Sequence, residues 1–186
     1  KDMLIAANNI ARAGDIIFYS NMDCPVHPDV YQHLLMRNEG AVEFIRRDVD
    51  DAKTYADLFN RKFKHYSIGV DGIAIKKEAI TTLLPMMPDL IIGEPHWDTA
   101  VSGILHKNFN TIQNLDHLYH VKHEQRWDDN NLSVGGKHNK KLYRDCVNYG
   151  LMEDELISIK KDCALILLKD TKQSGNTIKL LKQLRG

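Results

Sequence analysis

Short apolar runs alternate along the chain with segments in which apolar residues recur every three or four positions. The short runs have the composition of buried strands, and the periodic segments have the spacing of helices that cover a sheet. We predict strands over 15–20, 41–45 and 67–75, and a strand or strand-like turn over 89–93. We predict helices over 2–12, between 27–29 and 38–40, and over 50–62, 76–84 and 100–106.

This order predicts an α/β fold, with a mixed sheet flanked by helices. Apolar and polar residues alternate over 108–127. The segment 128–139 is polar and contains glycine, which predicts a loop. We predict further helices over 140–148 and 176–185. Residues 163–168 fit a strand or a helical turn. We therefore expect one α/β domain over 1–150 and a mostly helical extension over 151–186.

The composition limits the classes of partner. The 186 residues include 25 Lys and Arg and 25 Asp and Glu, so the formal net charge is zero. This balance argues against a broad basic face for nucleic acid and against a basic membrane-binding surface. No apolar run approaches ~18 residues, so we expect no transmembrane helix. Three widely spaced cysteines without a Cys-x-x-Cys pair, and no secretory leader, predict reduced thiols in a cytoplasmic protein.

The first candidate for chemistry is Asn21-Met22-Asp23, which follows the predicted strand 15–20. A carboxylate at a strand end can hold a divalent cation through hard oxygen ligands. The alternative is a turn in which Asn and Asp satisfy the backbone. A second candidate is Asp71, which lies between glycines 69 and 72. That pattern indicates either a site where the backbone approaches a ligand closely or a β-bulge.

A third candidate is the segment Glu94-Pro95-His96-Trp97-Asp98, immediately before a predicted helix. An Asp at a helix start accepts bonds from backbone N–H groups, which keeps it ionised and able to act as a base. Trp97 has a large face that can stack on a ligand. The alternative is that Asp98 only caps the helix, as could Thr99, and that Trp97 only fills the core.

The fourth candidate is the spaced histidine series His117, His120 and His123. Either a helix or a strand would bring at least one imidazole to a position from which it could complete a metal site. The alternative is that each histidine is a surface or structural residue.

Taken in chain order, these pieces resemble the second half of a GT-A glycosyltransferase, from its DxD-like motif onward. The resemblance covers roughly residues 1–127. It implies that Asp23 binds Mn²⁺ or Mg²⁺, with Asn21 beside it and His120 or His123 as a further ligand. It implies that Asp98, or as second choice Glu94, is the catalytic base.

The same resemblance implies that the substrate site is lined by Trp97, His96, Asp71 and Asn21. Because only 20 residues precede Asn21, it also implies that much of the N-terminal nucleotide-binding half is missing, and the start at Lys1 is consistent with truncation. The implied activity is metal-dependent transfer of a sugar from a nucleotide-sugar donor to a hydroxyl acceptor. The alternatives are a metal-dependent phosphoesterase or nuclease, and a non-catalytic binding module derived from a transferase.

Overall fold

The structure is a computed structural model that describes residues 1–35, 40–50, 54–60, 65–114, 117–121, 123 and 131–148. The predicted extension 151–186, with its segments 163–168 and 176–185, lies outside these residues. None of the helices in the described ranges combines the length and apolar character that a membrane crossing requires.

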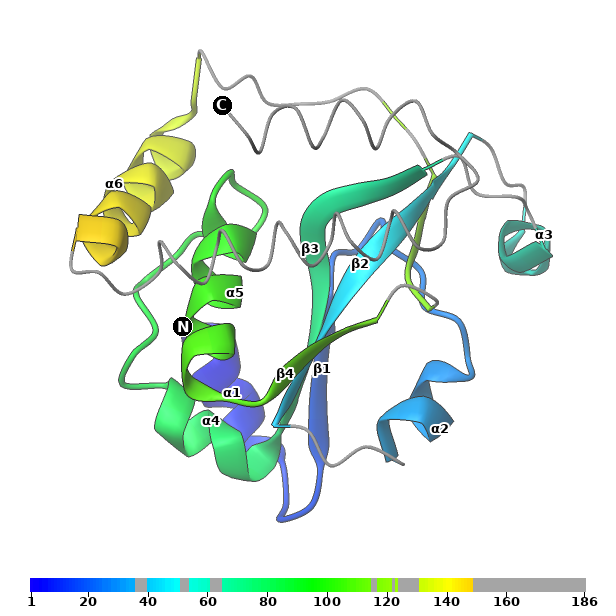
Figure 1. The fold of residues 1–186 in the computed structure, drawn as a ribbon, viewed down its shortest axis with the longest axis horizontal. Coiled ribbons are helices and arrows are strands. Elements are labelled where there is room, and N and C mark those ends of the chain that lie inside the picture. Colours follow the sequence, from blue (N-terminus) through cyan, green and yellow to red (C-terminus); the bar gives the residue numbers. More distant parts are fainter. Residues whose placement is uncertain are drawn as a thin grey trace.

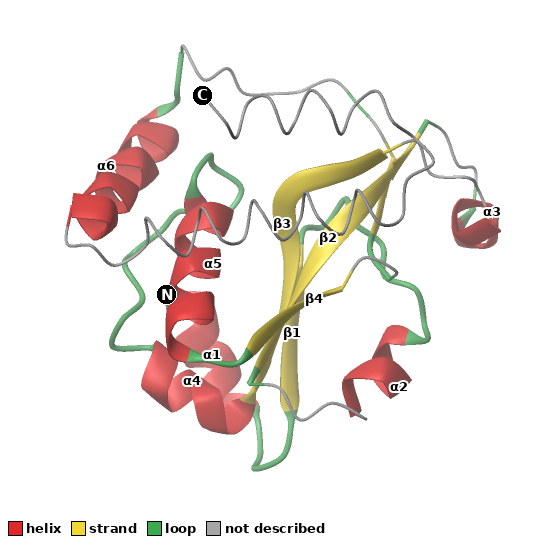
Figure 2. Cartoon of the chain, viewed as in Figure 1, coloured by secondary structure: helices red, strands yellow, loops and turns green. Residues whose placement is uncertain are grey.

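A mixed sheet forms the centre of the fold, as the sequence predicted, and it has five strands. The helices lie around it (Figures 1 and 2). The strand order is β1-β3-β2-β4, and β5 pairs with β2 further along the same strand. The β1/β3 and β3/β2 pairs are antiparallel, whereas β4 and β5 run parallel to β2. The strands are β1 (Ile16–Ser20), β2 (Ala41–Val49), β3 (His65–Lys76), β4 (Thr111–Asn114) and β5 (Tyr119–Val121).

Helices cover both faces of the sheet. On one face, α5 (Trp97–Asn108) and α4 (Lys77–Leu83) pack against β3, and α1 (Asp2–Ile10) packs against α4 (Figure 1). On the other face lies the short α2 (Val30–Leu35). The last described helix, α6 (Val134–Asn148), packs on the outer side of α5. The remaining helix, α3 (Tyr55–Asn60), lies beyond the far end of β2.

The alternation of side chains along β2 separates two apolar clusters. Ala41 and Ile45 join the cluster under α4 and α5, whereas Val42 and Phe44 join the cluster under α2. Phe44 is fully buried, and its ring meets that of Phe18 edge to face at 5.0 Å. This pattern is expected of a strand that is covered on both faces.

The structure differs from the predicted boundaries in several elements. Strand β2 continues to Val49 instead of ending at residue 45. Within the described part of the predicted helix 50–62, α3 spans Tyr55–Asn60. Of the two alternatives predicted for 89–93, the strand is wrong: 89–91 have no regular structure and 92–93 lie in a turn. Helix α5 begins at Trp97 rather than at residue 100.

The largest correction concerns the predicted loop over 128–139, because α6 begins inside it at Val134. The polar residues of this stretch are used in packing, since Asn139 is fully buried. Gly135 allows close contact with the preceding loop, because a Cβ there would lie 2.8 Å from Glu94 Cγ.

Candidate metal centre and its surroundings

Three side chains with metal-binding atoms meet beyond the end of β1. Asp23 follows β1, His120 lies on β5 and His123 follows β5; one ligand atom from each lies within 4.8 Å of the other two. Asp23 Oδ2 is 3.1 Å from His123 Nε2 and 3.7 Å from His120 Nε2. His120 is buried, whereas the side chains of Asp23 and His123 are each 49 % exposed. The cluster therefore has a buried side and an open side.

Asp48 orients the buried histidine of this cluster. Its Oδ1 lies 2.9 Å from His120 Nδ1, so the Nε2 atom of the same ring is left directed toward Asp23. Metal-binding histidines are commonly held in this way by a carboxylate on the other ring nitrogen. Asp23 also suits a metal ligand. Burial of its carboxyl opposes ionisation, but the hydrogen bond with His123 and the proximity of His120 bring the pKa of Asp23 below its usual value. The carboxylate form needed for a metal ligand is thus favoured.

A buried charged network continues from Asp48 into the sheet. Arg46 Nε donates to Asp48 Oδ1 at 3.0 Å, and Arg46 Nη1 donates to Asp71 Oδ1 at 3.1 Å. Asn21 Nδ2 also donates to Asp71 Oδ1, at 2.8 Å. The other oxygen of Asp71, Oδ2, is buried and has no hydrogen-bond partner among the described residues. Burial raises the pKa of Asp71, and Arg46 only partly offsets this effect.

Asp98 lies close enough to Asp71 to raise its pKa electrostatically. It is in the first turn of α5, whereas the N-cap of that helix is His96, which makes no side-chain cap bond. The expectation that backbone bonds keep Asp98 ionised is only partly met. Burial raises the pKa of Asp98, and this outweighs the hydrogen bonds from Thr99. Asp98 therefore holds its proton to a higher pH than an exposed aspartate does.

Trp97 is 7 % exposed and belongs to the apolar cluster under α5. Its ring meets Tyr19 of β1 edge to face at 5.3 Å. Tyr19 in turn donates from its hydroxyl to Asn21 Oδ1 at 3.0 Å, and burial raises the pKa of Tyr19 to about 12. Trp97 thus packs in the core and supports the strand end that carries Asn21.

Glu94 and His96 face α6 and do not join the Asp23 cluster. Glu94 accepts a hydrogen bond from the hydroxyl of Ser133, just before α6. His96 has a left-handed backbone with φ of 73°, and its ring stacks on Tyr143 of α6 at 5.7 Å. A non-glycine residue with positive φ is uncommon and is often found at functional or strained positions.

Asn139 of α6 holds the loop that leads to these residues. Its Oδ1 accepts from Ile91 N at 2.8 Å, and its Nδ2 donates to Ile91 O at 2.8 Å and to Pro95 O at 3.2 Å. A fully buried amide with these bonds fixes the backbone just before His96 and Asp98. Helix α6 is therefore part of the support of the candidate base.

The sequence reading missed Arg46 and Asp48 as parts of the site. The signal that could have indicated them is the pair of charges at alternate positions directly after an apolar strand segment, since a strand that continues places both on one face. In the sequence, the continuation of the strand is indicated by the apolar Val49 that follows these charges, and the structure buries this residue.

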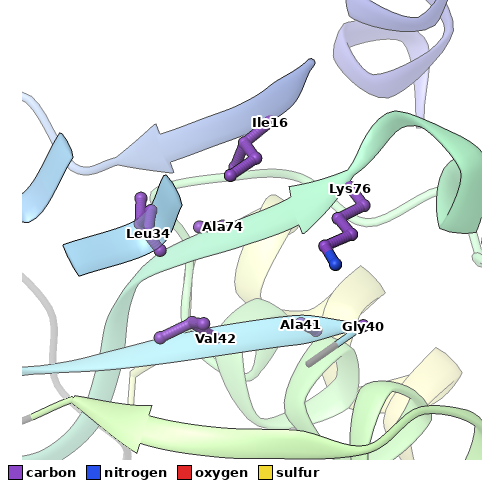
Figure 3. A pocket seen from close by; sticks show the side chains of 7 residues that line it. All are labelled: Ile16, Leu34, Gly40, Ala41, Val42, Ala74 and Lys76. Atoms are coloured by element: carbon purple, nitrogen blue, oxygen red, sulfur yellow. The ribbon is translucent and has the colours of Figure 1, made fainter. Parts of the chain in front are cut away.

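One pocket lies at the opposite end of the sheet (Figure 3). It is formed by the first residues of β1 and β2, the last residues of β3 and Leu34 of α2. Its cavity volume is about 10 Å³, which is close to the minimum that holds one water molecule. Its lining is apolar except for Lys76, so the pocket does not extend the Asp23 cluster.

A scan against protein-family models and searches against curated proteins and solved structures each gave no match. The functional argument therefore rests on the geometry of the site.

Proposed function

We propose that this chain is the metal-binding part of a glycosyltransferase that transfers a sugar from a nucleotide donor to a hydroxyl acceptor. The observation that carries the proposal is the meeting of Asp23, His120 and His123 beyond the end of β1. The buried acid Asp71 is linked to this cluster through Arg46 and Asp48, and the buried Asp98 lies close enough to Asp71 to raise its pKa. Their order along the chain is the order in which the GT-A resemblance places them.

The donor atoms of the cluster favour Mn²⁺ over Mg²⁺. Magnesium prefers oxygen ligands, whereas imidazole nitrogen suits softer divalent ions, and the cluster offers two imidazoles and one carboxylate. A bound divalent ion would supply positive charge that stabilises a departing diphosphate. Asp23 and His123 present the exposed side of the cluster, and His120 is its fixed buried anchor.

Asp98 is the best candidate for the general base. A base is most effective when its pKa lies near the working pH, and burial moves the pKa of Asp98 in that direction. Asp71 shapes the same region, because its negative charge beside Asp98 favours proton uptake by either group. Glu94 is the weaker candidate, since its carboxyl is already bonded to Ser133.

The test is a thermal-unfolding panel on the whole chain: protein alone, with Mn²⁺, with Mg²⁺ or Fe²⁺, and with Mn²⁺ plus UDP-, GDP-, ADP- or CMP-sugars. A ligand present at ~100 times its Kd stabilises the folded state by about 2.7 kcal/mol. At this chain length that corresponds to a rise in Tm of about 5 to 10 °C. We expect a rise with Mn²⁺ and a further rise with one nucleotide class.

Two other results would favour the alternatives. A rise with Mn²⁺ but with no nucleotide sugar would favour a binding module that retains only the metal centre. Hydrolysis of a phosphoester without sugar transfer would favour a phosphoesterase. Metal-dependent phosphoesterases usually require two adjacent metal ions. Within the described ranges only one group of three potential metal ligands is found.

A further inference from the structure

Two of the three potential metal ligands come from strands that do not pair with each other. Asp23 follows β1, which pairs with β3, and His120 lies on β5, which pairs with β2. In the order of the sheet, β3 and β2 therefore separate the two segments. Because backbone pairing does not join β1 to β5, the distance between Asp23 and His120 depends on side chains of the strands between them.

Arg46 lies on β2 and bonds two acids with its guanidinium. Nε donates to Asp48 Oδ1 at 3.0 Å, and Nη1 donates to Asp71 Oδ1 at 3.1 Å. The side chain of Arg46 is 26 % exposed, and those of Asp48 and Asp71 are 8 % and 10 % exposed. Hydrogen bonds between ionised groups are stronger than neutral ones, and the planar guanidinium fixes the directions in which it donates.

The bond to Asp48 acts on the buried histidine of the cluster. Asp48 Oδ1, which accepts from Arg46 Nε, is also the atom that lies 2.9 Å from His120 Nδ1. Asp48 therefore cannot turn away from His120 without breaking a charged hydrogen bond to Arg46. The orientation of the imidazole thus depends on Arg46 as well as on Asp48.

The bond to Asp71 acts on the turn that carries Asp23. Asp71 Oδ1 also accepts from Asn21 Nδ2 at 2.8 Å, and Asp71 O accepts from Asn21 N at 3.0 Å. Asn21 O accepts from Cys24 N at 3.0 Å, which closes a turn with Asp23 inside it. The place of the Asp23 carboxylate therefore depends on Asp71, which Arg46 holds from the other side.

Asp71 reaches these partners because it is the extra residue of a β-bulge. The consecutive residues 44 and 45 of β2 pair with residues 72 and 70 of β3, which leaves Asp71 without an opposite residue. The β-bulge that the glycines around Asp71 allowed is thus confirmed. A bulge re-aims a side chain, and bulges are common next to functional sites.

We propose that Arg46 is a positioning residue that holds both sides of the metal centre at the separation a shared ion requires. It acts on His120 through Asp48, and it acts on the turn of Asp23 through Asp71. The inference rests on the metal centre of the proposed function and adds to it a residue that supplies no ligand atom. The competing role for Arg46 is neutralisation of two buried acids, which needs only a positive charge at this place.

The test is the Kd for Mn²⁺ by isothermal titration calorimetry of the full chain, with the Tm without metal as the check on folding. Arg46→Lys keeps the charge, but an ammonium lacks the planar fork that holds two acids at a fixed angle. Loss of an outer partner of a metal ligand typically weakens metal binding about 10- to 100-fold, and we expect a loss in this range. The matched control is Arg47→Lys at the next residue of β2, where the guanidinium bonds the Tyr119 hydroxyl at 3.4 Å. This control should leave the Kd unchanged.

Arg46→Gln separates positioning from charge. Removal of a positive charge near the cluster would by itself strengthen the binding of a cation, whereas loss of positioning weakens it. We therefore expect weaker Mn²⁺ binding in Arg46→Gln than in the unaltered chain. In Asp48→Asn/Asp71→Asn the acids through which Arg46 acts are already replaced, so the addition of Arg46→Gln to this variant should cause no further loss.

The proposal is wrong if folded Arg46→Lys binds Mn²⁺ as tightly as the unaltered chain, if Arg46→Gln binds it more tightly, or if Arg47→Lys weakens binding as much as Arg46→Lys. Each of these results would leave the metal centre itself in place. If Arg46→Gln does not fold, Arg46→Lys remains the test, because it keeps the charge that the two acids require. Absence of Mn²⁺ binding to the unaltered chain would instead contradict the metal centre, and with it the proposed function.

Discussion

His120 and Asp48 form a buried pair in which the carboxylate of Asp48 lies 2.9 Å from His120 Nδ1. Both side chains are less than one-tenth exposed. The pair fixes the imidazole so that Nε2 lies toward Asp23, and this fixed ring is what separates the cluster from a chance grouping of exposed residues. Strand pairing places the two residues side by side, because Asp48 on β2 is in register with His120 on β5.

The His120–Asp48 pair predicts that replacing Asp48 weakens metal binding, although Asp48 is not itself a ligand. Replacing Asp48 with Ala removes the acceptor that orients His120, and loss of such a partner typically weakens metal binding 10- to 100-fold, about 1.4 to 2.7 kcal/mol. Asp48→Asn keeps an oxygen at the same place and should lose less. The measurement is the Kd for Mn²⁺ by isothermal titration calorimetry.

Asp29→Ala is the control for that series, because the Asp29 side chain is 74 % exposed and lies outside the cluster. It should leave the Kd for Mn²⁺ unchanged. If Asp48→Ala and the unaltered protein, both folded by circular dichroism, have equal affinity for Mn²⁺, then Asp48 does not orient His120 for metal binding.

The raised pKa of Asp98 predicts that replacing it with a neutral residue stabilises the fold, by an amount that depends on pH. Its pKa is raised in the folded state, so the stability that its protonated form contributes is complete below the unfolded pKa of about 3.9 and is lost as the pH rises through the folded pKa. Asp98→Asn keeps the oxygen that accepts from Thr99 and carries no charge. The Tm of this variant should exceed that of the unaltered protein at pH 7, and the difference should shrink toward pH 4.

The exposed Asp89 provides the comparison, since Asp89→Asn should show no such trend with pH. If Asp98→Asn also abolishes sugar transfer, the position trades stability for activity, as active-site acids often do. A lower Tm for Asp98→Asn at every pH would mean that the charge of Asp98 stabilises the fold.

Asn139 predicts a large loss of stability from one polar substitution. Asn139→Ala leaves the N–H of Ile91 and the carbonyls of Ile91 and Pro95, all partly buried, without their partner. A buried group left unsatisfied costs about 1 to 3 kcal/mol, so we expect the free energy of unfolding in urea to fall by about 2 to 3 kcal/mol. Asn110→Ala, at an exposed position, should change it by less than about 0.5 kcal/mol.

The buried Glu43 and the partly buried His106 form a second pair, between β2 and α5, with Oε2 and Nε2 3.0 Å apart. Glu43 is fully buried and its Oε1 has no partner among the described residues. His106→Ala removes the partner of a buried carboxyl, which typically costs about 3 to 5 kcal/mol. The double variant Glu43→Leu/His106→Leu should be more stable than His106→Ala in urea unfolding. The reverse order of stability would contradict the conclusion that His106 compensates the buried Glu43 carboxyl.

The sequence was sufficient for the elements with clear periodicity. The strands at β1 and β3 and the helix at α4 lie within a few residues of their predicted places, because apolar spacing marks all three, Gly14 precedes β1 and Pro85 follows α4. The start of α6 was not predictable in the same way. Its first turn contains two glycines and polar residues, and the reason that it is helical is tertiary: Asn139 and Gly135 pack on the loop that carries Glu94 and Pro95.

The candidate site was predicted in part as well. The strand-end Asp23 and the spaced histidines His120 and His123 pointed to a metal centre, and the structure brings these three together. Arg46 and Asp48 were missed because a charged pair after a strand more often marks a solvent-exposed end. Their burial depends on β5, which comes about 70 residues later and covers this part of β2.

Calorimetric titration of the full chain with Mn²⁺ tests the metal centre most directly. The account predicts one binding event per chain, lost in both Asp23→Ala and His123→Ala and retained in His27→Ala, whose imidazole lies outside the cluster. Loss in the first two variants with unchanged Tm in the absence of metal would establish Asp23 and His123 as ligands. Saturable binding that is equal in all four proteins, or no binding at all to the unaltered chain, would contradict the metal centre and with it the proposed transferase.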